Sequence, residues 1–399
     1  MRVLLFTGKG GVGKTTAAAG TGILGAIRGR KTLVLSTDAA HSLADAFDAD
    51  VRTEPTEIDA GLFVQQVDTQ RRFEQTWAEL QRYLVSVLDA AGVDPIEAEE
   101  LTVLPGAEEV LALLEVRAQV RSGRWDLVVV DCAPTAETLR LLALPDALGW
   151  YMNRVFPLER RMVRSLRPVL SRVAGVPMPQ DGVFDAIERL HGELADARRV
   201  LTDAATSSVR LVLTPESVVV AEARRTLTSL TLYGYSVDAV IANRVFPAGS
   251  GDSWRAGWVA AQSRQLADVE ATFAPLPVYR SSFRAGEPVG LEELAAFAAE
   301  AYGSGPRGAD PFAVASLGEL VAVDREDDQF VLSLALPLAD RRDVHLARKG
   351  DELVVTVGSH RRPISLPSAL RRCEVSGASL RDGRLRVAFV PDPRVWMRS

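Results

Sequence analysis

Near the start of the chain, glycine, lysine and threonine follow one another at a spacing that could hold a phosphate group. Residues 8–15 read GKGGVGKT, with Gly8 in the first position, Gly13 and Lys14 in the sixth and seventh, and Thr15 in the eighth. Glycines let a loop wrap around an anion with its N–H groups pointing inward, and a following helix N-terminus adds positive potential. In such a loop the lysine reaches the β- and γ-phosphates and the hydroxyl binds Mg²⁺. The pattern predicts nucleotide binding, with a plain glycine-rich turn as the alternative.

Two aspartates follow predicted strands and could complete this chemistry. Asp38 comes after an apolar run at residues 32–35, and Asp131 directly follows another at residues 127–130. A carboxylate in the position of Asp38 could orient and deprotonate an attacking water, although a helix N-cap is the alternative role. We expect Asp131 to hold Mg²⁺, with water between them.

The elements that position these residues follow from the spacing of apolar residues. Continuous apolar runs of strand length are typical of parallel strands buried on both faces, and they alternate here with amphipathic stretches. Strands alternating with helices imply a parallel sheet built of right-handed βαβ units. The expected strands are residues 3–6, 32–35, 127–130, 210–213 and 237–242, and the expected helices are 15–28, 184–201, 216–230 and 291–301.

The C-terminal part of the chain has a different pattern. Residues 303–311 (GSGPRGADP) have the composition of a linker. Beyond them, apolar and polar residues alternate with a period of two, and Asp382-Gly383 indicates a hairpin turn. We therefore expect a small antiparallel β domain over residues 312–399.

Composition excludes several classes of protein. The chain has 399 residues, 47% of them hydrophobic and 25% charged, and a net charge of −6, so a globular protein without a nucleic-acid partner is expected. Its two cysteines, Cys132 and Cys373, are too few for a disulfide framework, a four-thiolate zinc site or an iron–sulfur cluster. No apolar run approaches the roughly 18 residues of a membrane span, and residues 3–6 are too short for a signal peptide. We expect a cytoplasmic protein whose membrane contact is at most peripheral.

A second lysine inside the loop narrows the class of nucleotide site. Residues 9–16 (KGGVGKTT) resemble the deviant phosphate-binding loop shared by ParA/MinD partitioning ATPases, nitrogenase iron proteins and ArsA/GET-type ATPases. In these families the first lysine acts across a homodimer interface on the partner's nucleotide, as an arginine finger does. The resemblance implies this role for Lys9, against the alternative of a solvent-exposed side chain.

Three further segments are similar to one branch of that class, the ArsA/GET ATPases. They are residues 36–47 (STDAAHSLADAF), 105–109 (PGAEE) and 131–142 (DCAPTAETLRLL). The resemblance covers about residues 1–302 and implies a P-loop NTPase domain with a mostly parallel sheet, flanking helices and a helical insert at about 150–205. The sequence departs from the family pattern at Ala39, where proline is usual, and at Ala136-Glu137, where Gly-His is usual.

The resemblance also implies site residues, with ATP and Mg²⁺ as the ligands. Ala133, Pro134 and Thr135 would form the switch II loop that senses the γ-phosphate, and Asn243 would read the adenine. Asp38, Lys9 and Lys14 would be catalytic, and Thr15 and Asp131 would hold Mg²⁺. The nucleotide-binding residues would be Gly8, Lys9, Gly10, Gly11, Val12, Gly13, Lys14, Thr15, Thr16 and Asn243.

The helical insert allows three interpretations. In the targeting ATPases this segment builds a hydrophobic groove for a client, with methionines supplying adaptability. Here it contains Met152, Met162 and Met178, but residues 154–172 carry six arginines against one glutamate. A client groove, a patch for anionic lipid or acidic partners, and packing against a dimer mate all fit this stretch.

The β domain resembles an α-crystallin (small heat-shock) type sandwich, on residues 346–355, 361–367 and 380–387. Such a sheet binds peptides and partners and has no catalytic site, with a structural cap on the ATPase as the alternative. The chain contains neither the C-x-x-C zinc motif of some targeting ATPases nor the clustered cysteines that bind arsenite. Four histidines, His41, His191, His345 and His360, have no metal-ligand spacing.

Three functions remain open at this point. The first is a homodimeric, Mg²⁺-dependent ATPase that opens and closes around a protein client, with a hydrophobic client as one option. The second is an ATPase subunit that energises efflux of a metalloid or another anion. The third is a ParA/MinD-like positioning ATPase.

Overall fold

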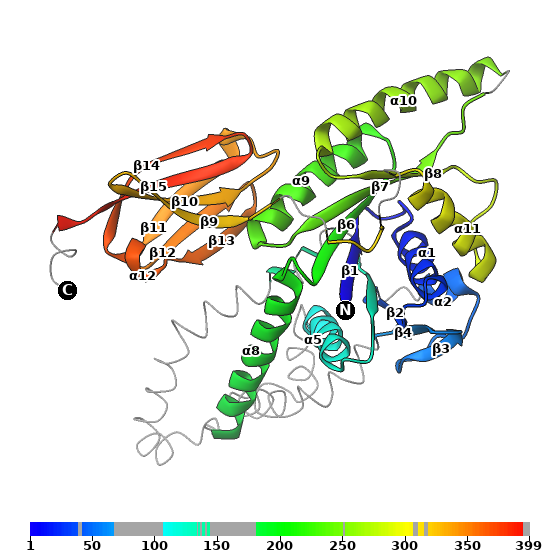
Figure 1. The fold of residues 1–399 in the computed structure, drawn as a ribbon, viewed down its shortest axis with the longest axis horizontal. Coiled ribbons are helices and arrows are strands. Elements are labelled where there is room, and N and C mark those ends of the chain that lie inside the picture. The colour runs from blue at the N-terminus through cyan, green and yellow to red at the C-terminus, as the bar shows by residue number, and fades with distance from the viewer. Residues whose placement is uncertain are drawn as a thin grey trace, which may run out of the picture.

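The computed structural model describes residues 1–38, 42–67, 107–133, 135, 138–139, 142–143, 181–249, 252–305, 310–314 and 318–393. Within these residues an eight-stranded sheet has the order β3-β4-β2-β5-β1-β6-β7-β8 (Figure 1). Its neighbouring strands pair in parallel, except for β3, which runs antiparallel to β4. The strands are β1 (Arg2–Thr7), β2 (Thr32–Ser36), β3 (Thr56–Asp59), β4 (Leu62–Gln66), β5 (Leu127–Asp131), β6 (Ser207–Leu213), β7 (Val237–Val245) and β8 (Val278–Ser282).

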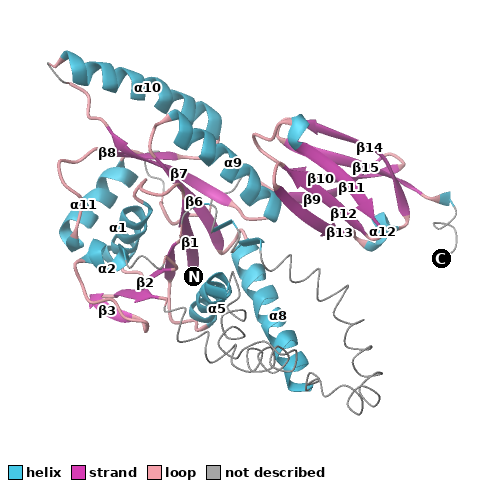
Figure 2. Cartoon of the chain, turned by 180° about the vertical axis from the view of Figure 1, so that it is seen from behind, coloured by secondary structure: helices cyan, strands magenta, loops and turns pink. Residues whose placement is uncertain are grey.

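Helices cover both faces of this sheet, which is why its central strands are apolar along their whole length. One face carries α1, α2 and α11, and the other carries α5, α8, α9 and α10 (Figures 1 and 2). Every residue of β1, β2 and β5 is buried. The helices are α1 (Lys14–Ile27), α2 (Ser42–Phe47), α5 (Ala107–Arg121), α8 (Asp181–Thr202), α9 (Ser217–Tyr233), α10 (Ser253–Phe273) and α11 (Gly290–Gly303).

The expected fold class is confirmed, and each expected strand of this domain falls within an observed one. Strands β3, β4 and β8 and helices α5 and α10 were not predicted. The sequences of β3, β8 and α10 mix apolar and polar residues without a clear period. The predicted helix at 184–201 lies within α8. The arginine-rich stretch at 154–172 and the three methionines of the insert lie outside the described residues.

The C-terminal domain is a sandwich of two antiparallel sheets. One sheet has the order β14-β15-β10-β9 and the other β11-β12-β13. The predicted hairpin turn is confirmed, because Asp382 and Gly383 both have positive φ, 50° and 67°, as a type I′ turn requires. The elements are β9 (Val321–Glu326), β10 (Gln329–Ala335), the 3₁₀-helix η1 (Arg341–Asp343), β11 (Val344–Lys349), β12 (Glu352–Val357), β13 (His360–Ser365), α12 (Ser368–Arg371), β14 (Cys373–Arg381) and β15 (Arg384–Pro391).

The sandwich packs against the C-terminal end of α9 (Figure 2). Leu232 of α9 is fully buried within the sandwich core, and Thr228 Oγ1 donates to the carbonyl oxygen of Pro337 at 2.6 Å. Arg362 donates to the carbonyl oxygen of Leu232 at 2.5 Å, which satisfies an orphan carbonyl at the helix end. The interface thus combines an apolar anchor with hydrogen bonds to backbone oxygens.

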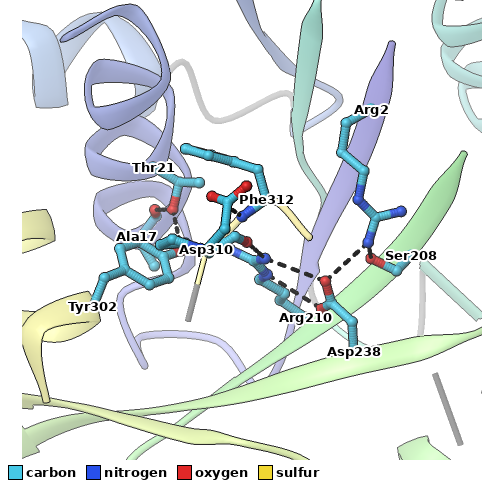
Figure 3. A network of polar contacts seen from close by, with 10 residues as sticks. Arg2, Ala17, Thr21, Ser208, Arg210, Asp238, Tyr302, Asp310 and Phe312 are labelled. Atoms are coloured by element: carbon cyan, nitrogen blue, oxygen red, sulfur yellow. Dashed lines mark hydrogen bonds and ion pairs between the residues drawn. The ribbon is translucent and has the colours of Figure 1, made fainter. Parts of the chain in front are cut away.

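A buried charge cluster joins the amino-terminal parts of β1, β6 and β7 (Figure 3). Asp238 accepts from Arg2 at 3.1 Å and from Arg210 Nε and Nη2, both at 3.2 Å, and all three side chains are at most 4% exposed. Burial works to lower the pKa of Arg210, but the charge and hydrogen bond of Asp238, together with Tyr302 and Tyr279, outweigh it, and the pKa is raised. Arg210 also donates to Tyr302 Oη at 2.8 Å and to the carbonyl oxygen of Pro311. The cluster therefore ties the segment after α11 to the sheet.

We expect Asp238→Ala to lower the free energy of unfolding by about 3–5 kcal/mol, because it leaves two buried guanidinium groups without a counter-charge. Urea denaturation at pH 7 measures this. Asp268→Ala is the matched control, since the pair between Asp268 and Arg224 is about half exposed and should contribute less than about 1 kcal/mol. Equal losses in the two variants would contradict the structural role of the cluster.

Candidate functional site

The phosphate-binding loop begins directly after β1 and ends at the first residue of α1. Two of its glycines cannot carry a side chain. A Cβ at position 8 would lie 2.1 Å from the carbonyl oxygen of Val212, and one at position 13 would lie 2.3 Å from Asn243 Nδ2. Gly13 also has a φ of 91° and caps α1, so the helix N–H groups open onto the loop. The predicted strand, loop and helix are all present.

The two lysines of the loop have different surroundings. Lys14 is 7% exposed, and its Nζ lies 3.5 Å from the carbonyl oxygen of Lys9, so its side chain folds back over the loop. Lys9 itself is half-buried and does not line the cavity described below. Lys14 therefore lines the cavity of its own chain, whereas Lys9 does not.

The predicted magnesium ligands lie together. Thr15 Oγ1 donates to Asp131 Oδ2 at 2.8 Å and lies 3.2 Å from the hydroxyl of Ser42. Asp131 Oδ1 is buried and has no hydrogen-bond partner among the described residues. Burial raises the pKa of Asp131 to about 7, and the charge of Asp38 adds to the rise, against the lowering effects of the Thr15 hydrogen bond and of Lys14. A hydroxyl beside a carboxylate with an unused oxygen is a hard-oxygen ligand set, so these residues fit Mg²⁺.

The loop after β2 places Asp38 opposite the phosphate-binding loop. Its backbone carbonyl accepts from Gln66 Nε2 at 2.7 Å, and its N–H donates to Ser36 Oγ at 3.2 Å. Thr37 N–H donates to the carbonyl oxygen of Asp131 at 2.9 Å, which ties the ends of β2 and β5 together. Asp38 is half-exposed, at the cavity wall. Residues 39–41 lie outside the described part of the chain.

The loop after β5 is described in part. The carbonyl oxygen of Ala133 accepts from Thr138 Oγ1 at 2.7 Å, which bends the chain back after the strand. Thr135 Oγ1 is buried without a hydrogen-bond partner among the described residues. Pro134, Ala136 and Glu137 lie outside these residues, so the predicted sensing of a γ-phosphate by this loop stays a prediction.

Asn243, at the end of β7, touches the phosphate-binding loop directly. Its Nδ2 donates to the carbonyl oxygen of Val12 at 2.8 Å. Its Oδ1 accepts from the N–H of Arg244 at 2.8 Å and from Ser281 Oγ at 2.7 Å. The side chain is 6% exposed and lies at the cavity wall. The structure thus brings this residue to Val12 of the loop from 231 positions further along the chain.

These segments enclose a cavity of about 740 Å³. Eight of the predicted site residues line it: Gly10, Gly11, Gly13, Lys14, Thr15, Thr16, Asp38 and Asn243. The lining residues do not include Gly8, Lys9, Val12, Asp131, Ala133 and Thr135. Its lining residues extend from the phosphate-binding loop to Val289, directly before α11, and to Phe297 within that helix.

Sequence reasoning missed several lining residues. Ser42 and Asp45 lie within the segment 36–47 that we compared with the ArsA/GET family, so that segment was the available signal. Arg244 and the loop from Ser282 to Val289 complete the far end. Arg284 of this loop pairs with Glu293 at 3.3 Å and Glu300 at 2.9 Å, which holds the loop against α11.

The remaining chemically active residues are separate from the cavity. Among the described residues, no group of three His, Cys, Asp or Glu side chains could hold a metal ion. Cys132 is buried, and burial raises the pKa of its thiol. Cys373 is buried in the sandwich. Neither thiol is suited to bind a ligand at the cavity.

The raised pKa of Asp131 predicts a pH-dependent stability. The folded protein holds the proton of the Asp131 carboxyl more tightly than the unfolded chain does, because the carboxyl pKa is about 7 in the folded protein and 3.8 in the unfolded chain. The free energy of unfolding therefore falls as pH rises from about 4 through about 7. Without Mg²⁺, Asp131→Asn should therefore be more stable than the parent protein above pH 7, with the difference shrinking toward pH 4.

Thermal denaturation in EDTA at pH 5, 6, 7 and 8 measures this difference. The exposed Asp50→Asn serves as the control and should follow the parent profile. A constant difference between Asp131→Asn and the parent across this range would contradict the perturbed carboxyl.

Comparison with known proteins identifies the family to which this chain is similar. A family profile described as "Anion-transporting ATPase" matches residues 1–303, and one described as "HSP20-like domain found in ArsA" matches residues 327–389. A Chlorobaculum tepidum protein that carries the name arsenical pump-driving ATPase is 37% identical, covering 98% of this chain and 96% of the relative. A Streptomyces coelicolor protein is 40% identical over 100% of both chains. The match to the ATPase profile contains every segment around the cavity, and the chain therefore belongs to the ArsA ATPase family.

Proposed function

We propose that the protein is a Mg²⁺-dependent ATPase whose homodimer opens and closes with the nucleotide state to bind and release a protein client. The observation that best supports the proposal is the hydrogen bond between Thr15 and Asp131. Thr15 and Asp38 both line the cavity, so the proposed Mg²⁺ ligands and the proposed general base belong to one site. A phosphate cradle, a hard-oxygen ligand pair and a carboxylate near the attacking side are the parts that phosphoryl transfer to water needs.

Each residue has a role that its surroundings support. The N–H groups of the loop and of the first turn of α1 hold the β- and γ-phosphates, and Lys14 adds a positive charge there. Thr15 and Asp131 would hold Mg²⁺, which supplies charge neutralisation at the β- and γ-phosphate oxygens when bound. Asp38 orients the attacking water and accepts its proton. Gln66 holds the backbone of Asp38 in this place through its 2.7 Å hydrogen bond.

The position of Lys9 supports the proposed homodimer. This lysine lies in the loop but not among the residues that line the cavity of its own chain. A lysine that does not line the cavity of its own chain could deliver its charge to the nucleotide of a second copy that faces it. Such an arrangement would make hydrolysis depend on dimer closure.

The C-terminal sandwich favours a protein client over an exported anion as the molecule on which the ATPase acts. It matches an HSP20-like profile, and the resemblance implies a surface that binds peptides. The names of two relatives favour a second candidate, an ATPase that energises anion efflux. A thiol-bound metalloid is hard to reconcile with the two cysteines, since both are buried and they belong to different domains. None of the helices that the structure describes is long and apolar enough to cross a bilayer.

We expect Asp38→Asn to bind ATP and Mg²⁺ with nearly the parent affinity but to lose at least about 100-fold in turnover, because the phosphate cradle is intact and the general base is lost. Lys14→Ala should instead weaken nucleotide binding itself. Calorimetric titration and phosphate release measure the two effects separately. Parent-like turnover in Asp38→Asn would contradict its assigned role, with Asp50→Asn as the surface control.

The Lys9 proposal predicts complementation between two inactive variants. In a mixed dimer of Lys9→Ala and Asp38→Asn chains, one site combines an intact Asp38 with an intact Lys9 from the other chain. Mixing should therefore restore activity that neither variant has alone, up to one site per heterodimer. If heterodimers form and no activity returns, Lys9 does not act across the interface.

A further inference from the structure

The first half of α10 is exposed, whereas its second half packs on the sheet. Leu266, Val269 and Phe273 are buried, but no residue from 253 to 265 is buried. This first half extends away from the body of the domain (Figures 1 and 2). Residues 253–263 (SWRAGWVAAQS) nevertheless include a single charged side chain, Arg255. The solvent face of a helix normally carries charged and polar residues, so this composition indicates a contact surface.

Four aromatic rings form a continuous strip from this half of the helix to the cavity. The ring centroids of Trp254 and Trp258 are 5.9 Å apart, and those of Trp258 and Phe246 are 6.3 Å apart. Phe246 stacks on Phe283 at 5.3 Å, and Phe283 lines the cavity. Trp254 is 71% exposed, Trp258 54% and Phe283 49%, and they are the most exposed aromatic side chains that the structure describes. We call these four residues the aromatic strip.

Two hydrogen bonds attach the aromatic strip to the cavity wall. Gln262 lies one turn after Trp258 on α10, and its Nε2 donates to the carbonyl oxygen of Arg244 at 2.9 Å. Its Oε1 accepts from the N–H of Phe246 at 2.6 Å. Arg244 lines the cavity and has a φ of 57°, a left-handed conformation that is unfavourable for a residue with a Cβ. Gln262 thus joins the strip to this part of the wall.

The aromatic strip lies on the side of the domain at which the cavity opens. Apart from Phe297, the lining residues lie at or after the carboxyl ends of β1, β2, β7 and β8. Helix α10 follows β7 in the chain, so its first residues lie beyond the same edge of the sheet. In the proposed homodimer, Lys9 of a second copy reaches the nucleotide in this cavity. A second copy that covers the cavity therefore lies beside the strip.

The charge of this surface suits a second copy of the same chain. In a twofold dimer the same patch serves both partners, so a strongly charged patch would repel its copy. The side chain of Arg255 turns back to its own chain, where Nη2 donates to the carbonyl oxygen of Pro247 at 3.5 Å. Tryptophan is enriched among the residues that contribute most to protein interfaces. On the basis of the proposed homodimer, we propose that the aromatic strip contacts the second copy when nucleotide closes the dimer.

Sedimentation velocity with Mg²⁺ and the ATP analogue AMP-PNP tests the proposal. The double variant Trp254→Ala/Trp258→Ala should dimerise at least about tenfold more weakly than the parent, because truncating a buried interface tryptophan is costly. Ile27→Ala is the control and should dimerise as the parent does, since this side chain is 68% exposed at the end of α1 away from the cavity.

Calorimetric titration of ADP separates dimerisation from nucleotide binding. Neither Trp254 nor Trp258 lines the cavity. At protein concentrations at which the parent is monomeric, the double variant should therefore bind ADP with the parent affinity.

A thiol footprint measures whether the aromatic strip itself is covered. Both native cysteines are buried, so a maleimide should react mainly at the new thiol of Trp254→Cys. AMP-PNP and Mg²⁺ should slow this reaction in proportion to the fraction of dimer and have no effect on dilute, monomeric protein. Ile27→Cys should react at the same rate under all these conditions.

Three results would contradict the inference. The first is parent-like dimerisation of the double variant with unchanged labelling of Trp254→Cys in the dimer, which would leave the proposed function intact. The second is protection of this thiol by vesicles of phosphatidylglycerol and phosphatidylcholine but not by the dimer, which would assign the strip to a membrane surface. The third is a parent protein that stays monomeric with AMP-PNP at all concentrations, which would contradict the proposed homodimer itself.

Discussion

The register between three parallel strands determines where the phosphate-binding loop, Asp131 and Asp38 lie relative to one another. Phe6 of β1 pairs with Asp131 of β5, and Asp131 pairs on its other side with Ser36 of β2. The chain leaves each strand within two residues of these pairs, so the phosphate-binding loop, Asp131 and Asp38 emerge side by side. A shift of β5 by one residue relative to β1 and β2 would turn the Asp131 side chain to the other face of the sheet and away from Thr15.

Buried charge lies at both ends of the central strands. Where β1, β6 and β7 begin, Asp238 pairs with both Arg2 and Arg210. One positive charge remains in this cluster, and Arg2 Nε and Nη1 have no hydrogen-bond partner among the described residues. Where β5 ends, one oxygen of the buried Asp131 also lacks a partner among these residues, but this carboxylate lies beside the Thr15 hydroxyl. The ion pairs join strands of the fold, whereas the Asp131 carboxylate belongs to the candidate site.

The sandwich contacts α9 at the end that lies away from this site. Helix α9 starts after the carboxyl end of β6 and runs back, so Thr228 and Leu232 lie toward the edge where β7 begins. Among the described residues, none from the C-terminal domain lines the cavity of its own chain.

The sequence by itself determined the class of fold and the phosphate-binding loop. Glycine, lysine and threonine at fixed spacing need only local backbone geometry, and continuous apolar runs report burial on both faces wherever the strands lie. It could not place Asn243 against Val12, or Ser281 behind Asn243, because these contacts join residues 231 and 38 positions apart. Nor could it reveal the ion pair between Arg210 and Asp238, because each of these residues stands among ordinary residues of its own strand. The tertiary structure decided these features, since only the lateral order of the strands determines which side chains meet.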